Sequence, residues 1–324
     1  MKSTLLIIIA GLILWSCQPP EAPVSFEHDI TSGPTPWTSS VFEKRQRDFT
    51  FAIISDLTGG ERRGVYGTAV SQLNRLDPAF VLSVGDLIEG GSRDSAVLAA
   101  EWNSFEQRTA RLNMPFFHLG GNHDLTNPIM REVWKSRFGP RYYHFRYEDV
   151  LFLMLDSEDF DEELMNEIDQ ARAEAMRVLR GEVEGVWEET KYHKMPESHN
   201  GGVSDEQLAY FTEVLGEHDD ARWTFVMMHK PLWRREDDNG LRKLEELLQD
   251  RPYTVINGHI HSFSHRKRHG RDYIILGTTG GFQPENDSMA FDHVTLVRMD
   301  EEPVITHLKM NGILDEKGNV PLPR

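Results

Sequence analysis

The feature of this sequence that most restricts its fold is a series of seven short apolar runs. The runs are FTFAIISD, PAFVLSVGD, MPFFHLGGNHD, DVLFLMLDSE, RWTFVMMHK, YTVINGHIH and DYIILGTTGG. Their nearly continuous hydrophobicity is typical of strands that are covered on both faces, as in layered α/β proteins. Between the runs, amphipathic patterns predict helices at residues 64–76, 94–112, 128–138, 163–180, 204–216 and 240–250.

Three further segments carry local signals. The stretch DHVTLVRMDEEPVITHLKMNG alternates like two paired strands joined by a turn at residues 300–303, and HRKRHGR at 265–271 predicts a solvated hairpin turn. Ser204 followed by Gln207 is a capping box, which places a helix start there. Residues 181–202 have no clear period, so we expect either a long loop over the working face or a disordered surface insertion.

The N-terminus has the composition of an export signal. Lys2 precedes an apolar run from Leu5 to Trp15, which is shorter than the roughly 20 residues that a membrane-spanning helix needs. Cys17, the only cysteine, follows directly. The segment resembles a bacterial lipoprotein signal, in which this cysteine becomes the lipidated first residue, although Trp15 stands where a small or aliphatic residue is usual. A cleaved signal and a plain membrane anchor are the alternatives.

These patterns divide the chain into four parts. Residues 1–17 are the expected signal peptide with its lipidation-type cysteine, and residues 18–48, rich in Pro, Ser and Thr, are the expected flexible tether. Residues 49–315 form the expected folded domain, and residues 316–324 a C-terminal tail. The net charge of −17 argues against a nucleic-acid partner. We therefore expect an exported cell-envelope lipoprotein, periplasmic or associated with the outer membrane, attached to the membrane by a lipid anchor.

Five of the apolar runs end in residues that are typical metal ligands. Ligands in open α/β sheets bind beyond the carboxyl ends of the strands, so these side chains are expected to converge although they are far apart in sequence. One such residue after one strand is most often structural, whereas five of seven strand ends of this kind indicate a metal site. The residues are Asp56, Asp86, Asn122, His229 and the pair His259 and His261.

The blocks D-x-T, GD, GNHD, H and GHxH, in this order, resemble those of the calcineurin-like metallophosphoesterases over roughly residues 49–282. The resemblance implies a four-layer α/β/β/α sandwich of two mixed sheets. It also implies hydrolysis of a phosphomonoester or phosphodiester by a hydroxide that bridges two divalent cations. The implied ligands are Asp86 to both cations, then Asn122, His229 and His259 to one, and Asp56 and His261 to the other.

The resemblance further implies a general acid. His123 matches the residue that protonates the leaving alkoxide in this family, with Asp124 orienting the imidazole and raising its proton affinity. A helix cap is the structural alternative for Asp124. Mixed carboxylate, amide and imidazole ligands suit manganese, iron or zinc better than calcium or magnesium.

One position departs from the family pattern. The first block is usually D-x-H, with the histidine as a ligand, but this chain has Thr58 there. Purple acid phosphatases also lack that histidine and use a tyrosine three residues after the bridging aspartate, where this chain has Glu89. A carboxylate ligand at that spacing would favour manganese or iron over zinc. The alternative for Glu89 is a solvated loop residue near Arg93.

The remaining signals are weaker. The segment GTTGG at 277–281 either presents backbone N–H groups to a phosphate or serves only a tight turn, and Arg62 and Arg63 are candidate ligands of substrate oxygens. The expected substrate is a phosphorylated small molecule or a lipid-linked phosphate. A catalytically impaired metal-binding or scaffold lipoprotein that retains the fold is the rival hypothesis. Four histidines are expected to be structural: His118, His144, His193 and His199.

Overall fold

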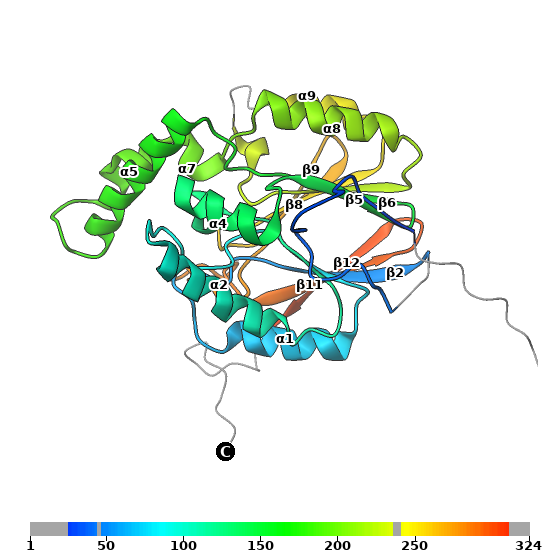
Figure 1. Cartoon of the computed structure of the whole chain (residues 1–324), viewed down its shortest axis with the longest axis horizontal. Coiled ribbons are helices and arrows are strands. Elements are labelled where there is room, and N and C mark those ends of the chain that lie inside the picture. The colour runs from blue at the N-terminus through cyan, green and yellow to red at the C-terminus, as the bar shows by residue number, and fades with distance from the viewer. Residues whose placement is uncertain (1–24, 44–46, 236–240, 311–324) are drawn as a thin grey trace, which may run out of the picture.

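The computed structural model describes residues 25–43, 47–235 and 241–310, so the expected signal peptide and C-terminal tail lie outside the described residues. Two β-sheets stack face to face, and helices cover both outer faces (Figure 1). This arrangement confirms the expected four-layer α/β/β/α sandwich. Among the described residues, no helix has the length and apolar character needed to cross a membrane.

Both sheets are mixed. In the smaller one, β2, β3 and β4 run parallel and β11 and β12 antiparallel, and in the larger one β6, β7, β8 and β10 form the parallel centre. The five-stranded sheet has the order β12 (Pro303–Lys309), β11 (His293–Met299), β2 (Phe49–Ile54), β3 (Val81–Ser83) and β4 (Phe116–Phe117). The seven-stranded sheet has the order β1 (Phe26–Glu27), β5 (Tyr143–Tyr147), β6 (Val150–Met154), β7 (Trp223–Met227), β8 (Tyr253–Asn257), β10 (Arg271–Ile275) and β9 (Ser264–Arg268).

The helices lie on the two outer faces. α1 and α2 pack on the five-stranded sheet, α4 packs against α2 in the same apolar cluster, and α8 and α9 pack on the seven-stranded sheet (Figure 1). α5 lies at the edge of the layers. The helices are α1 (Val65–Leu76), α2 (Ser95–Thr109), α3 (Asn122–Leu125), α4 (Pro128–Phe138), α5 (Glu162–Leu179), α6 (Lys191–Lys194), α7 (Pro196–Asn200), α8 (Asp205–Glu217) and α9 (Leu241–Leu248), with 3-10 turns η1 (Trp187–Glu189) and η2 (Leu232–Arg234).

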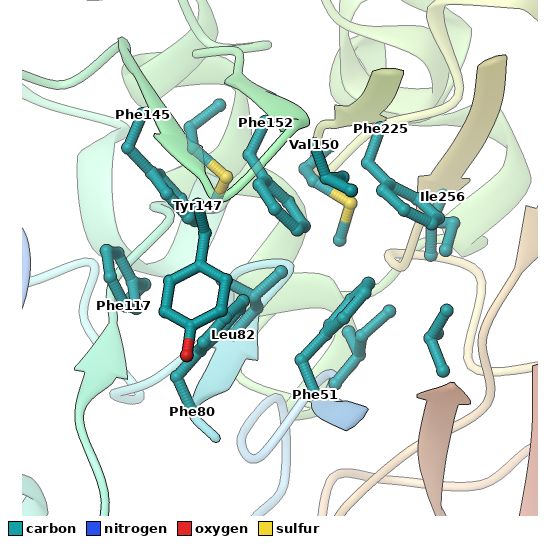
Figure 2. Close-up of a cluster of buried hydrophobic side chains, with 14 of the residues drawn as sticks. Phe51, Phe80, Leu82, Phe117, Phe145, Tyr147, Val150, Phe152, Phe225 and Ile256 are labelled. Atoms are coloured by element: carbon teal, nitrogen blue, oxygen red, sulfur yellow. The ribbon is translucent and has the colours of Figure 1, made fainter. Parts of the chain in front are cut away.

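Alternation along the strands explains why both faces of each sheet are buried. On β2, Phe51 and Ile53 point into the core between the sheets, whereas Ala52 and Ile54 point to the core under the helices. The inter-sheet core is largely aromatic (Figure 2). There the ring of Phe51 meets those of Phe152 and Phe225 edge-on, each with centroids 5.1 Å apart. Strands with apolar residues at nearly every position are typical of sheets that are covered on both faces.

Most of the predicted elements are confirmed. Each predicted helix is present with its ends shifted by at most three residues, and β11 and β12 pair as the expected hairpin. The Ser204 side chain accepts a hydrogen bond from the Gln207 amide, as a capping box requires. The Gln207 side chain instead donates to the carbonyl of Asp156, so Asp159 takes its place and accepts from the Ser204 amide.

Two segments differ from or refine the expectations. Residues 25–43, assigned by composition to a tether, pack on the folded body: β1 pairs with β5, and Trp37 and Phe42 are 6% and 4% exposed in the inter-sheet core. A few aromatic side chains anchor a segment that is otherwise rich in Pro, Ser and Thr. Residues 181–202 form η1, α6 and α7, and Tyr192 and Met195 pack against α5 rather than forming a disordered insertion.

Candidate metal centre

Four of the predicted ligands adopt an unusual backbone conformation. Asp56, Asp86, His259 and His261 have φ values of 48°, 57°, 73° and 58°. Residues other than glycine seldom adopt this left-handed region, because the Cβ atom crowds the backbone. All four lie within a few residues of the ends of β2, β3 and β8, so the strained turns direct their side chains toward one edge of the two sheets. Strain of this kind is typical of functional sites.

The first cluster of potential ligands is formed by Asp86, His229 and His259, whose donor atoms all lie within 4.8 Å of one another. Nε2 of His229 is 3.2 Å from Oδ2 of Asp86 and 3.1 Å from Oδ1 of Asn122. Asp86, His229 and Asn122 are buried. The structure therefore brings together the four residues that were predicted to hold one cation.

The second cluster contains Asp56, Asp86 and His261, again within 4.8 Å of one another. Nε2 of His261 lies 3.3 Å from Oδ1 of Asp56. The Asp56 carboxylate also accepts hydrogen bonds from the backbone N–H of His259, at 3.1 Å, and from the Ser55 hydroxyl. Asp86 belongs to both clusters, as expected for a carboxylate shared by two cations.

Each histidine is oriented by a backbone carbonyl. Nδ1 of His229 lies 2.8 Å from the Val84 carbonyl, Nε2 of His259 lies 2.9 Å from the Ser198 carbonyl, and Nδ1 of His261 contacts the Phe282 carbonyl. A carbonyl only accepts, so each of these nitrogens carries the hydrogen and the opposite nitrogen presents a lone pair. Nε2 of His229 then faces two oxygen atoms, an arrangement of three electron-pair donors that fits a metal cation.

The electrostatics of the first cluster support this interpretation. Although burial acts in the opposite direction, the Asp86 carboxylate raises the pKa of His229 to about 9. The same pairing holds the pKa of Asp86 well below its usual value, against the effect of burial. The oxygens around His229 thus stabilise positive charge at Nε2, where a divalent cation can replace the proton.

His123 lies beside the two clusters. Its backbone N–H donates to Oδ1 of Asp86 at 2.9 Å, and its ring Nδ1 is 2.6 Å from the Glu89 carbonyl. The rings of His123 and His261 both face Gly59. A Cβ atom added to Gly59 would lie 3.5 Å from Nε2 of His123 and 3.3 Å from the His261 ring. Burial lowers the pKa of His123; the nearby Arg172 adds to this effect and Asp86 opposes it.

Asp124 differs from the expected role. Its carboxylate accepts hydrogen bonds from the amides of Gly121, Leu87 and Ile88, at 2.8, 3.0 and 3.2 Å. The bond from the Gly121 amide caps the start of α3, as in the structural alternative, and the bonds from Leu87 and Ile88 join the GNHD loop to the GD loop. The Glu89 carbonyl, and not Asp124, orients the imidazole of His123. Burial, together with the negative charge of Asp86, raises the pKa of Asp124 to about 8.

Thr58 and Glu89 both make hydrogen bonds away from the clusters. The Thr58 hydroxyl donates to the Ile88 carbonyl at 2.7 Å, so it fastens the loop after β3. The Glu89 side chain is exposed, and its carboxylate accepts from the amides of Gly60 and Glu61 at 3.0 and 2.7 Å. The Glu89 carboxylate is therefore in neither cluster of potential ligands. At this position the backbone carbonyl of Glu89, and not its side chain, faces His123.

The arginine pair and the glycine-rich loop also have structural partners. Nη2 of Arg62 lies 2.6 Å from the Asp292 carboxylate, and its Nε donates to the Gly281 carbonyl. Arg63 is exposed. The amides of residues 277–281 are bonded within the protein, for example Gly281 to the Asp56 carbonyl at 2.8 Å. Of the two alternatives for residues 277–281, a phosphate-binding loop and a tight turn, the structure shows the tight turn. Arg62 bonds this loop and does not face the clusters.

Two contributions to the site escaped the sequence analysis. Arg172 on α5 approaches His123, and the Ser198 carbonyl on α7 holds His259. A signal for Arg172 was present: it lies on the buried face of α5 with Ile168 and Ala175, so a charged residue interrupts an apolar stripe. A backbone carbonyl such as that of Ser198 leaves no signal in the sequence.

Three solved structures illustrate the similarity of the fold to known proteins. A dimetal phosphatase from Danio rerio is 18% identical with a TM-score of 0.57, over 81% of this chain and 96% of that chain. GAP50, the anchor in the inner membrane complex of Plasmodium, is 15% identical with a TM-score of 0.51, over 84% and 86%. A purple acid phosphatase from yellow lupin seeds is 13% identical with a TM-score of 0.54, over 86% of this chain and 53% of that chain. No curated protein sequence matches the chain.

The sequence profile of the calcineurin-like phosphoesterases matches residues 49–263. This range exceeds half of the 324 residues and contains every residue of the two clusters, from Asp56 to His261. The matched blocks are those whose side chains converge at the strand ends. The chain belongs to the calcineurin-like phosphoesterase family.

Proposed function

We propose that this protein hydrolyses a phosphomonoester or phosphodiester with the help of two divalent cations, which are manganese, iron or zinc; the preference for manganese or iron required Glu89 as a ligand, and its carboxylate lies in neither cluster. The observation that carries the proposal is the convergence of three carbonyl-oriented histidines on two buried carboxylates, one of which, Asp86, lies in both clusters. Asn122, His229 and His259 would hold one cation with Asp86, and Asp56 and His261 the other. When bound, such cations neutralise the charge of a phosphate and lower the pKa of water.

His123 is the proposed general acid. Its Nδ1 carries the hydrogen that is donated to the Glu89 carbonyl, so Nε2 is the nitrogen that holds the transferable proton. Burial and Arg172 lower its pKa, which makes the imidazolium a stronger acid toward a leaving alkoxide. Replacing His123 by alanine should lower kcat by about 10² to 10⁴ for an ester with a poor leaving group, since general acid catalysis is of that size.

The test combines metal content with turnover. The purified protein should bind two cations, measured by plasma mass spectrometry after manganese loading, and should hydrolyse p-nitrophenyl phosphate or its bis ester. Asn122→Ala should abolish turnover. Asn166→Ala is a matched control, because the Asn166 amide only bonds the Glu162 carbonyl on α5. A protein without bound metal and without turnover under any cation would contradict the proposal.

A scaffold function is the second candidate. It is favoured by Thr58, whose hydroxyl is bonded to the Ile88 carbonyl at the position where the family usually has a ligand. A structural neighbour, GAP50, is described as an anchor. A scaffold protein would lack turnover with every phosphoester, and Asn122→Ala would leave its partner binding unchanged.

We also propose that the protein is exported and attached to a bacterial cell envelope through a lipid on Cys17. The short apolar run that ends at Cys17 supports this proposal. Substrates would then be phosphorylated small molecules or lipid-linked phosphates, and the net charge of −17 argues against nucleic acid. Labelling with radioactive palmitate in a bacterial host should mark the wild-type chain and not Cys17→Ser. Equal labelling of both chains, or labelling of neither, would contradict the lipid anchor.

A further inference from the structure

Arg172 brings a guanidinium group to the edge of the metal centre. The residue is 9% exposed, and its Nη2 lies 3.4 Å from Nδ1 and 3.3 Å from Nε2 of His123. A nitrogen that is equally far from both ring nitrogens is not aligned with the lone pair of either. Nδ1 is in addition already bonded to the Glu89 carbonyl. The contact with His123 therefore does not satisfy the guanidinium donors.

Other arginines with restricted exposure donate to carboxylates or backbone carbonyls. Arg131 donates to the carbonyls of Leu125, Phe160 and Glu158. Arg62 pairs with Asp292 at 2.6 Å, Arg141 with Asp156 at 3.0 Å, and Arg222 with Asp149 at 2.8 Å. Among residues 25–43, 47–235 and 241–310, no carboxylate forms an ion pair with Arg172. A buried cation without a counterion is costly, and an anion that binds beside it offsets this cost. The missing partner of Arg172 is thus expected to be an anion from outside the chain.

The loop that follows Asp86 leaves room for this guanidinium. Gly91 has a φ of +70°, and a Cβ atom at this position would lie only 2.5 Å from Nη1 of Arg172. Any other residue would displace the guanidinium or strain the backbone. Ile168 and Ala175, one helical turn before and after Arg172, lie with it on the buried face of α5.

We propose that Arg172 binds an oxyanion of the substrate phosphate beside His123, as an addition to the metal centre. This inference rests on the proposed phosphoesterase function. The planar donors of a guanidinium match two phosphate oxygens, and its charge persists at every working pH. A doubly charged phosphomonoester gains more from this cation than a singly charged diester. Arg172 accordingly biases the site toward monoesters.

The experiment compares Arg172→Gln with Arg177→Gln in the manganese-loaded protein. Arg177 is on the same helix, but its side chain is 56% exposed and pairs with Glu182. Binding of inorganic phosphate is measured by calorimetry, and KM and kcat are measured for p-nitrophenyl phosphate and its bis ester. Arg172→Gln should weaken phosphate binding and raise KM for the monoester by roughly 10- to 100-fold, as expected for a charged hydrogen bond. The effect on the bis ester should be smaller, and Arg177→Gln should change neither.

Stability separates this role from a structural one. Because Arg172 is buried without a carboxylate, Arg172→Gln should keep or raise Tm and keep the manganese content. Arg172→Lys should restore part of the phosphate affinity. A lower Tm with phosphate affinity within twofold of wild type would overturn the proposal.

The phosphate titration also separates this proposal from the phosphoesterase function. Weaker phosphate binding by Arg172→Gln in a protein without turnover would support the anion site and contradict the phosphoesterase. Normal turnover with unchanged phosphate affinity in Arg172→Gln would contradict the anion site alone.

Discussion

Nε2 of His229 lies 3.2 Å from Oδ2 of Asp86, and both side chains are almost completely buried. Because Asp86 is common to both clusters, its charge would serve both of the proposed cations. Asp86→Asn should therefore lower the manganese content from two ions per chain to well below one, as measured by plasma mass spectrometry. Asp56→Asn touches one cluster and should mainly remove one ion. Equal losses in the two variants would show that Asp86 is not shared.

Glu89 provides a test of how the chain compensates for Thr58. Its carboxylate bonds the amides of Gly60 and Glu61, so Glu89→Ala should keep the metal content of the wild type. Mass spectrometry of the manganese-loaded variant checks this, with Glu61→Ala as the control. A fall toward one ion per chain would show that the exposed Glu89 side chain turns to the cation and replaces the missing histidine.

Arg62 should act on stability and not on substrate binding. Arg62→Met removes the cation beside Asp292, which is buried and also accepts from the Thr278 hydroxyl. Loss of one partner of a buried pair costs about 3 kcal/mol, which urea denaturation should detect. KM for the phosphoester should stay unchanged, and the exposed Arg63 should tolerate Arg63→Met in both measurements. A raised KM at unchanged stability would instead make Arg62 a substrate ligand.

Acid should destabilise the protein partly through His118. Burial lowers the pKa of His118 to about 4, although its ring bonds the Pro36 carbonyl. The unfolded chain, with a histidine pKa of about 6.5, binds the proton more readily. The stabilisation is therefore full above about pH 6.5 and is lost as the pH falls toward 4. Between pH 7 and pH 5 this single group should lower the free energy of unfolding by about 2 kcal/mol.

The measurement is urea denaturation of wild type and His118→Gln at both pH values. The variant should lose about 2 kcal/mol less on acidification. Effects common to both chains, such as metal release, cancel in this difference. His269→Gln, in the exposed turn between β9 and β10, should lose as much as the wild type. An equal loss in His118→Gln would show that His118 does not govern the acid response.

The layers were predictable because their signal is local and repeated. Nearly continuous apolar runs such as those of β2 and β7 require cover on both faces, and amphipathic helices supply it. The segment 25–43 was not predictable from composition, since Trp37 and Phe42 are isolated anchors in a polar stretch. A segment that is held by isolated aromatic side chains has no periodic hydrophobic pattern, so its sequence does not predict that it packs on the domain.

The site was predictable only as far as its residues follow strands. Asp56, Asp86 and His229 lie two or three residues after the ends of β2, β3 and β7, so topology alone brings them to one edge. The roles of Asp124 and Glu89 depend on which backbone amides and carbonyls the loops bring together, and residue spacing does not determine this. For Glu89 the carbonyl faces His123 and the carboxylate faces the amides of Gly60 and Glu61.

The Ser198 carbonyl gives the outer segment a direct part in the chemistry. It fixes the ring of His259 from α7, which belongs neither to the two sheets nor to the helices that cover them. Deletion of residues 187–200 would remove the Ser198 carbonyl, so the imidazole of His259 would lose the contact that fixes its orientation toward the proposed cation. Substitutions in this stretch would then be expected to change metal affinity without altering any of the proposed ligands.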